Sequence, residues 1–162
     1  MPQRFQEFSS FSPQSRGGNH VAFVSITRLR VRSWRYLPAF FVQSLRSAWQ
    51  AKSEIGCLAV AVLRDTGNAF WTRTVWENED AMRSFMLSGV HQRGMHRLRE
   101  WCDEASVVHW LQESPQPPSW DEAHRHIQGD GRPSMVNHPS LAHRSYKIPL
   151  PKVRPGQELR LK

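Results

Sequence analysis

The stretch 57–76, CLAVAVLRDTGNAFWTRTVW, decides the fold. Residues 57–65 and 69–76 are rich in the β-branched, aromatic and aliphatic side chains that strands favour. Thr66, Gly67 and Asn68 separate them, and a short Gly/Asn connection between two apolar runs is typical of a tight β-hairpin. We therefore expect two antiparallel strands here.

A strand and a helix precede this hairpin. Residues 21–27, VAFVSIT, are β-branched and apolar, and we expect this strand to end in the polar segment 28–33. From 34 to about 53, apolar residues recur at helical spacing, with Ser33 as the expected N-cap and Pro38 within the first turn. Gly56 follows as a stop signal.

A second helical region and a fourth strand follow the hairpin. Asn78 is the expected cap, and Gly89 is expected to break or kink the helix before a longer stretch that runs to Trp101. The acidic pair 103–104 is expected to form a turn, and residues 105–111 a strand. The order βαββαβ predicts an α+β, ferredoxin-like domain over residues 21–112.

The two ends of the chain differ in composition from this domain. Residues 1–20 mix Ser, Gln, Pro and Gly without periodicity, and we expect a disordered tail. Eight of the eleven prolines lie between Pro115 and Pro155, so residues 113–162 are expected to form a short helix near 120–128 and an extended Pro-rich arm that wraps the core or a partner chain.

Charge and cysteine content narrow the class of protein. The net charge of +8 comes from 18 Arg and 4 Lys, locally clustered only at Arg28, Arg30, Arg32 and Arg35. No nucleic-acid motif accompanies the cluster, so we favour a solvated basic surface over nucleic-acid binding. Two cysteines without ligand spacing indicate neither disulfides nor zinc. Without an apolar run long enough for a membrane span or a signal core, the sequence predicts a soluble cytoplasmic protein.

Both faces of the predicted sheet carry apolar side chains. In the third strand Thr72, Thr74 and Trp76 point one way and Trp71 and Arg73 the other. Two helices cover one face of such a sheet, and an uncovered apolar face is normally closed by a second copy or by a ligand. We therefore predict a homodimer.

His91 is the first candidate for chemistry. It lies on the inward stripe of the second helical region with Met95, Leu98 and Cys102. An inward imidazole can ligate haem iron or move protons, or it can be a structural side chain with a hydrogen-bond partner. Gly89 before it either leaves room for a planar ligand or is a plain helix break.

Several further residues are candidates for an apolar substrate pocket. Arg73 lies among apolar residues, where a charge needs a partner or an anionic ligand. For His109 and Trp110 we favour sheet packing, and for the pocket aromatics core filling remains the alternative. The candidate pocket residues are Trp71, Arg73, Trp76, Phe85, Met95 and Trp101.

Four stretches resemble a bacterial family related to the antibiotic biosynthesis monooxygenases and spheroidene monooxygenase. They are SITRLRVRSWRYLPAFF, FWTRTVWENEDAMRSFM, SGVHQRGM and WCDEASVVHW. The resemblance implies a dimeric α/β barrel with a pocket in each subunit between sheet and helices. Relatives differ in chemistry: some oxidise polycyclic aromatic substrates without a cofactor, some bind or degrade haem through a helix-borne His, and others are non-catalytic.

The resemblance gives His91 in SGVHQRGM the position most like the haem ligand. It implies a monooxygenase-like oxidoreductase acting on an apolar aromatic or polyene substrate, either with haem on His91 or without a cofactor. The alternative is a non-catalytic module that binds a small ligand. The sequence has no P-loop, GxGxxG, GxSxG or HExxH motif, so nucleotide, hydrolase and zinc-protease chemistry lack support.

Overall fold

The computed structural model describes residues 21–162, and the predicted disordered tail over 1–20 lies outside the described residues. One antiparallel sheet organises the chain, with strands in the order β5-β4-β1-β3-β2-β6. The long strands are β1 (Ala22–Val31), β2 (Cys57–Arg64), β3 (Ala69–Trp76) and β4 (Cys102–Gln112). Short edge strands, β5 (Arg132–Pro133) and β6 (Glu158–Arg160), flank them.

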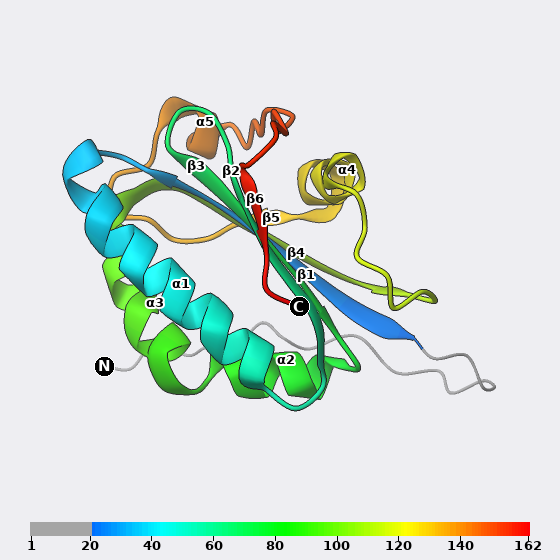
Figure 1. Ribbon diagram of the computed structural model, residues 1–162. Helices are drawn as coiled ribbons and strands as arrows, with labels where there is room; N and C mark the ends of the chain where they lie inside the picture. Colours follow the sequence, from blue (N-terminus) through cyan, green and yellow to red (C-terminus); the bar gives the residue numbers. More distant parts are fainter. Residues whose placement is uncertain (1–20) are drawn as a thin grey trace, which may run out of the picture.

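Three helices cover one face of the sheet (Figure 1). They are α1 (Leu37–Ser53), which follows a 3-10 turn over Trp34–Tyr36, α2 (Glu79–Met86) and α3 (Gly89–Trp101). Asn78 caps α2 as predicted, because its side chain accepts a hydrogen bond from the Ala81 amide. Ser33 makes no side-chain cap, and α1 begins only at Leu37 with Pro38 in its first turn. The βαββαβ order and the α+β ferredoxin-like fold are thus confirmed.

Two strands are longer than the sequence indicated. β1 continues through Arg28 and Arg30 instead of ending there, and β4 begins at Cys102, so Asp103 and Glu104 lie in a strand and not in a turn. The two errors share one cause. Arg28 and Arg30 pair with Glu104 and Asp103 of the neighbouring strand, and this cross-strand neutralisation lets both charged segments join the sheet.

The arginines of the basic cluster therefore mostly contact other side chains of the same chain. Besides the two pairs above, Arg32 pairs with Glu100, and the Arg35 guanidinium lies 6.0 Å from the centre of the Tyr36 ring. Three of the four arginines of the cluster, Arg28, Arg30 and Arg32, thus have a carboxylate partner within the chain.

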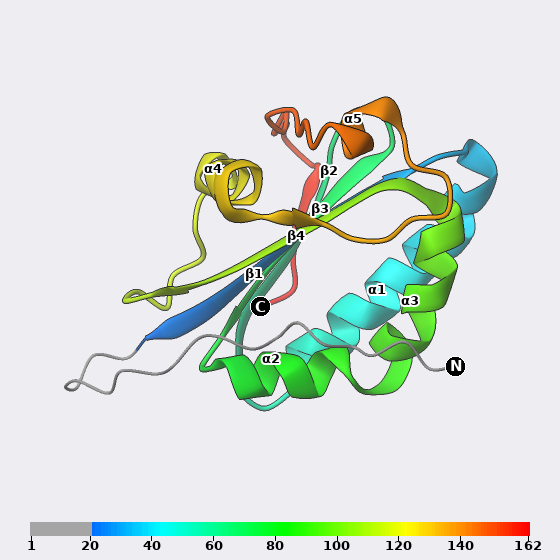
Figure 2. The ribbon, with the colours of Figure 1, turned by 180° about the vertical axis from the view of Figure 1, so that it is seen from behind.

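The second face of the sheet is covered by the chain's own C-terminal part. Figures 1 and 2 show α4 (Trp120–Asp130) and α5 (Leu141–Arg144) on the side opposite α1 and α3. Trp120, Ala123 and Ile127 of α4, together with Ile148, pack on Val24, Ile26, Leu63, Trp71, Val75 and Val108. From the sequence we expected a second copy or a ligand on this face, and the C-terminal arm on the core or on a partner chain. The arm lies on the core and closes the face itself. The second copy was predicted here because apolar residues spaced widely along a Pro-rich segment gave no signal that they gather on one surface.

Arg73 helps to hold this cover in place. Its guanidinium donates to the carbonyl of Pro118 at 2.5 Å and pairs with Glu158 at 2.9 Å. It also lies 4.4 Å from the centre of the Trp120 ring. The buried charge is thus partnered by the ends of the segment that covers the face, and burial nevertheless lowers the pKa of Arg73.

Candidate functional site

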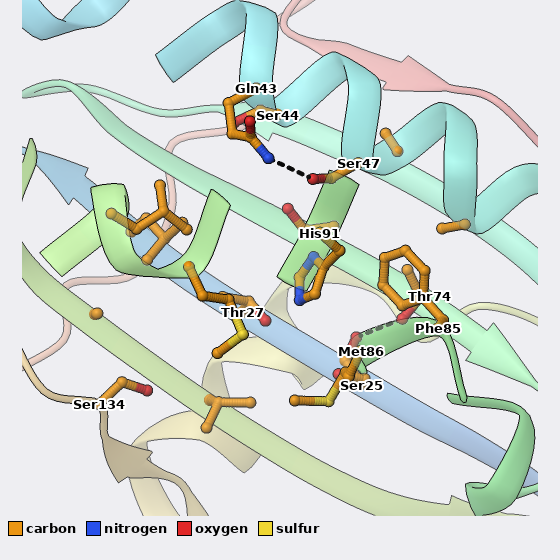
Figure 3. Close-up of a pocket in the computed structure, with 18 of the residues that line it drawn as sticks. Ser25, Thr27, Gln43, Ser44, Ser47, Thr74, Phe85, Met86, His91 and Ser134 are labelled. Atoms are coloured by element: carbon orange, nitrogen blue, oxygen red, sulfur yellow. Dashed lines mark hydrogen bonds between the residues drawn. The ribbon is translucent and has the colours of Figure 1, made fainter. Parts of the chain in front are cut away.

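A cavity of about 240 Å³ lies between the helix-covered face of the sheet and the helices. Strands β1, β3 and β4 form its floor, α1 forms one wall, and α2 and α3 form the other. Figure 3 shows side chains from all these elements converging on the space. Its lining is mostly apolar, and none of the described residues that line it is a carboxylate. Such a space suits a neutral, apolar ligand.

The floor carries hydroxyl groups in register across neighbouring strands. Ser25 of β1 stands opposite Thr74 of β3 and opposite His109 of β4. One step along, Thr27 stands opposite Thr72. All five side chains line the cavity. Since adjacent strands lie about 4.8 Å apart, the floor offers hydrogen-bonding groups at roughly that spacing beneath an apolar roof.

Two glutamines of α1 fix the turn that carries His91. Gln50 donates to the carbonyl of Ser88 at 3.0 Å and accepts from the backbone amide of His91 at 3.1 Å. Gln43 donates to the carbonyl of Val90 at 2.8 Å. A side chain at Gly89 would collide with Gln50, at 2.8 Å, and Gly89 has φ +59. Gly89 therefore makes room for Gln50 and not for a planar ligand.

The imidazole of His91 points into the space between helices and strands (Figure 3). Its ring packs against that of Phe85, with 4.6 Å between centroids, and Phe85 in turn stacks on Trp76. Burial lowers the pKa of His91 from 6.5 to about 4. The ring is consequently neutral at pH 7, with one nitrogen able to donate and the other able to accept.

His109 is a second neutral imidazole in the lining. Burial, with smaller contributions from Arg132 and Arg83, lowers its pKa to about 4. Its Nε2 atom is buried without a hydrogen-bond partner among the described residues, and its ring lies 5.5 Å from that of Phe23. An unpartnered buried nitrogen is costly, which distinguishes His109 from an ordinary packing residue.

The structure brings three of the predicted site residues together and separates the others. His91, Phe85 and Met95 line the cavity. Trp76 lies behind Phe85 in the core on the same face, and Trp101 stacks on Tyr36 outside the lining.

Trp71 and Arg73 lie on the opposite face, under the C-terminal cover. Their assignment to the pocket is corrected by the alternation of β3, which sends Thr72 and Thr74 to the cavity and Trp71 and Arg73 away from it. The alternation of β4 likewise places His109 on the cavity side, although sheet packing was the favoured prediction for it. The threonines and Ser25 were missed because hydroxyl side chains are common in strands and carry little signal alone.

Haem does not fit this site. His91 could supply an axial ligand, but about 240 Å³ is below the roughly 300–1,000 Å³ of pockets for drug-sized ligands, and haem is among the larger of these. Haem carries two negatively charged propionates, and Arg99 is the one Lys or Arg among the described lining residues that could pair with them. Within residues 21–162 no group of three or more His, Cys, Asp and Glu residues could hold a metal ion. The lining of the cavity therefore does not fit haem.

The fold defines an α+β protein of the ferredoxin-like type, and solved structures agree. A protein from Nitrosomonas europaea named as a candidate antibiotic biosynthesis monooxygenase is similar over 65% of this chain and 100% of its own, with a TM-score of 0.52 and 13% identity. A conserved Methanosarcina mazei protein is similar over 56% of this chain and 92% of its own, with a TM-score of 0.51 and 15% identity.

A Bacteroides thetaiotaomicron protein described as a candidate oxidoreductase is similar over 59% of this chain and 100% of its own, with a TM-score of 0.50 and 12% identity. At these identities the likeness extends to the fold alone. A search of curated protein sequences finds no significant match. The model of the family described as "Domain of unknown function (DUF3291)" matches residues 43–131, more than half of the chain, and the chain belongs to that family.

Proposed function

We propose that this protein is a monooxygenase-like enzyme that oxidises a compact, neutral aromatic substrate held in the cavity, with O₂ and without haem. The observation that carries the proposal is an apolar cavity with a neutral imidazole in its wall. The solved structures named as a monooxygenase and as an oxidoreductase share the fold and agree with this reading. The volume of the cavity, about 240 Å³, favours a compact ring system over a long polyene.

The cavity residues suit a substrate that supplies its own electrons. A ring CH₂ group activated by a neighbouring hydroxyl or carbonyl can react as R₂CH₂ + O₂ → R₂C=O + H₂O, so that one oxygen atom enters the product and the other leaves as water. In this scheme the floor hydroxyls of Ser25 and Thr27 orient the oxygen substituents. His91 accepts the proton that leaves the substrate, and the ion pair formed offsets the cost of charging a buried ring.

The test is turnover by the purified protein. It is incubated in air with anthrone-type ketones and hydroxylated naphthalenes, and products are identified by mass spectrometry with ¹⁸O₂. We expect one labelled oxygen in the product, and a loss of about 100-fold in His91→Phe, while Trp34→Phe at an exposed site is unchanged. Turnover that is equal with and without the protein would contradict the proposal.

The second candidate is a non-catalytic module that binds a small ligand. It is favoured by the low pKa of both cavity imidazoles, which makes them weak bases, and by the lack of a carboxylate among the described lining residues. The same incubations separate the two candidates. Substrate binding, followed by calorimetry, without any labelled product would support the module.

We also retain the proposals of a cytoplasmic location and a homodimer. Cys57 and Cys102 are buried free thiols, as a reducing compartment favours. In residues 21–162 there is no helix of sufficient length and apolarity to cross a membrane.

Because the chain itself covers the second sheet face, a dimer has to form through another surface. Light scattering coupled to gel filtration measures the mass in solution, and a monomer would overturn the dimer proposal.

A further inference from the structure

The methionines of the described chain all gather on the cavity. Met82 and Met86 come from α2, Met95 from α3, and Met135 from the segment after β5. They span the whole depth of the site: Met82 is 2% exposed, whereas Met95 and Met135 are 42% and 70% exposed at the rim. Four methionines from three separate segments therefore share one surface, which we call the methionine wall.

The remaining sides of the cavity are rigid. The floor is built largely from side chains branched at Cβ, such as Thr27, Thr72 and Val107, whose χ1 angles are restricted, and these residues are held in the sheet by strand pairing. The α1 side presents Ser44, Ser47, Ala48 and Ala51, which are too short to change shape. Gln43 of α1 is longer, but it is tied to the carbonyl of Val90.

Freedom to adapt is thus concentrated on one side of the site. Methionine has three rotatable bonds and a polarisable sulfur, which lets it fill irregular gaps and serve surfaces that accept several partners. The segment of Met135 is anchored on both sides of it, because Ser134 donates to the carbonyl of Ala105 at 2.8 Å and Asn137 to that of Arg99 at 2.9 Å. Its side chain can therefore move at the rim while the backbone stays in place.

We propose that the methionine wall makes the cavity adaptable. The protein then accepts a series of compact aromatic ligands that share one ring and differ in the shape of the part that faces α2 and α3. This inference rests on the proposed function and names its range of substrates. The shared ring lies between the floor and α1. The variable part displaces the side chains of Met82, Met86, Met95 and Met135.

The test compares the affinities of a ligand series for two variants. Naphthalene, anthracene and phenanthrene diols are titrated into the wild type, into the triple variant Met82→Leu, Met86→Leu, Met95→Leu, and into Val107→Leu on the floor. Leucine keeps the approximate volume and apolarity of methionine but has fewer rotatable bonds, so the fold is expected to tolerate it. Circular dichroism and thermal unfolding check that the variants fold.

We expect the wild type to bind the series with affinities within about tenfold, and the triple variant to widen that range by a further tenfold or more, at the expense of the broadest ligands. Val107→Leu should weaken all ligands alike. If the diols bind and the triple variant keeps the wild-type range of affinities, the inference is overturned while the proposed function stands. If no diol binds the wild type, the proposed function itself fails, and the inference with it.

A second readout does not depend on affinity. With ¹³C-methyl methionine labelling, each cavity methionine gives one methyl signal, assigned through single Met→Leu variants. Ligands of different outline should shift different methyl signals. Identical shifts for every ligand would show that the wall does not adapt and would contradict the proposal.

Discussion

The two faces of the sheet are built from alternate residues of the same strands, yet one is hollow and the other is solid. On the helix side, Thr72 and Thr74 of β3 border a cavity of about 240 Å³. On the other side, their neighbours Trp71 and Val75 are fully buried under α4 and the C-terminal segment. Side-chain size explains the contrast, because short hydroxyl side chains on the floor and alanines and serines on α1 leave the space that tryptophans fill on the solid face.

The largest effect is expected on the solid face. Trp71 is 0% exposed, and its indole nitrogen donates to Asp65 at 3.1 Å. Trp71→Ala should lower the free energy of unfolding by about 3–5 kcal/mol, since it removes a large buried side chain and leaves a void. Urea unfolding measures this. Trp34→Ala, at a position 75% exposed, is the control and should change stability by less than about 0.5 kcal/mol. Equal effects would mean that the second face is not closed.

A smaller effect comes from acid and acts on the hollow face. His91 and His109 have folded-state pKa values of about 4 and an ordinary value of 6.5. Between pH 6.5 and pH 4 the two imidazoles are protonated in the unfolded chain but remain neutral in the folded chain. Their contribution to the free energy of unfolding is therefore fully present above pH 6.5 and falls as the pH is lowered toward 4. We expect a loss of about 1–2 kcal/mol for each imidazole by pH 5.

The double variant His91→Phe, His109→Phe isolates this acid effect. Its urea midpoint should fall less between pH 7 and pH 5 than that of the wild type, because neither phenylalanine titrates. The same fall in both proteins would show that other groups are responsible.

The smallest changes in stability are expected from enlarging two buried alanines on helices. Ala123 of α4 is 0% exposed in the solid face, and Ala48 of α1 is 4% exposed at the cavity. Ala123→Leu should destabilise by about 1–3 kcal/mol because the face has no space for added carbons. Ala48→Leu should change stability by less than about 1 kcal/mol, since the new side chain enters the cavity. Equal costs at the two sites, measured by urea unfolding, would contradict the difference between the faces.

Local signals predicted the hairpin and the cap of α2 from the sequence. Residues 57–65 and 69–76 contain β2 and β3 as expected, and Asn78 caps α2, because strand composition, turn residues and N-caps act within a few positions. The end of β1 was missed because it depends on contacts between residues far apart: Arg28 is neutralised by Glu104, 76 positions away.

The candidate site was likewise predicted where local patterns decide side-chain direction and missed where they do not. Helical periodicity placed His91 and Met95 on an inward stripe, and both line the cavity. Strand alternation separated Trp71 and Arg73 from Thr72 and Thr74, but aromatic character was given more weight than side-chain direction. The cover over the second face was predicted only in part. A short helix near 120–128 and an arm on the core or on a partner chain were expected, but the sheet face that they cover was not, since Trp120, Ile127 and Ile148 reach it through Pro-rich connections without a regular pattern.

Calorimetric titration of a neutral naphthalene diol tests the central claim, that the hollow face is a ligand site, most directly. The wild type and Ala48→Leu are compared at pH 7, where His91 is neutral. The account predicts saturable one-to-one binding by the wild type and at least tenfold weaker binding by the variant, whose stability is nearly unchanged. Equal affinities for the two proteins, or no binding by the wild type, would contradict it.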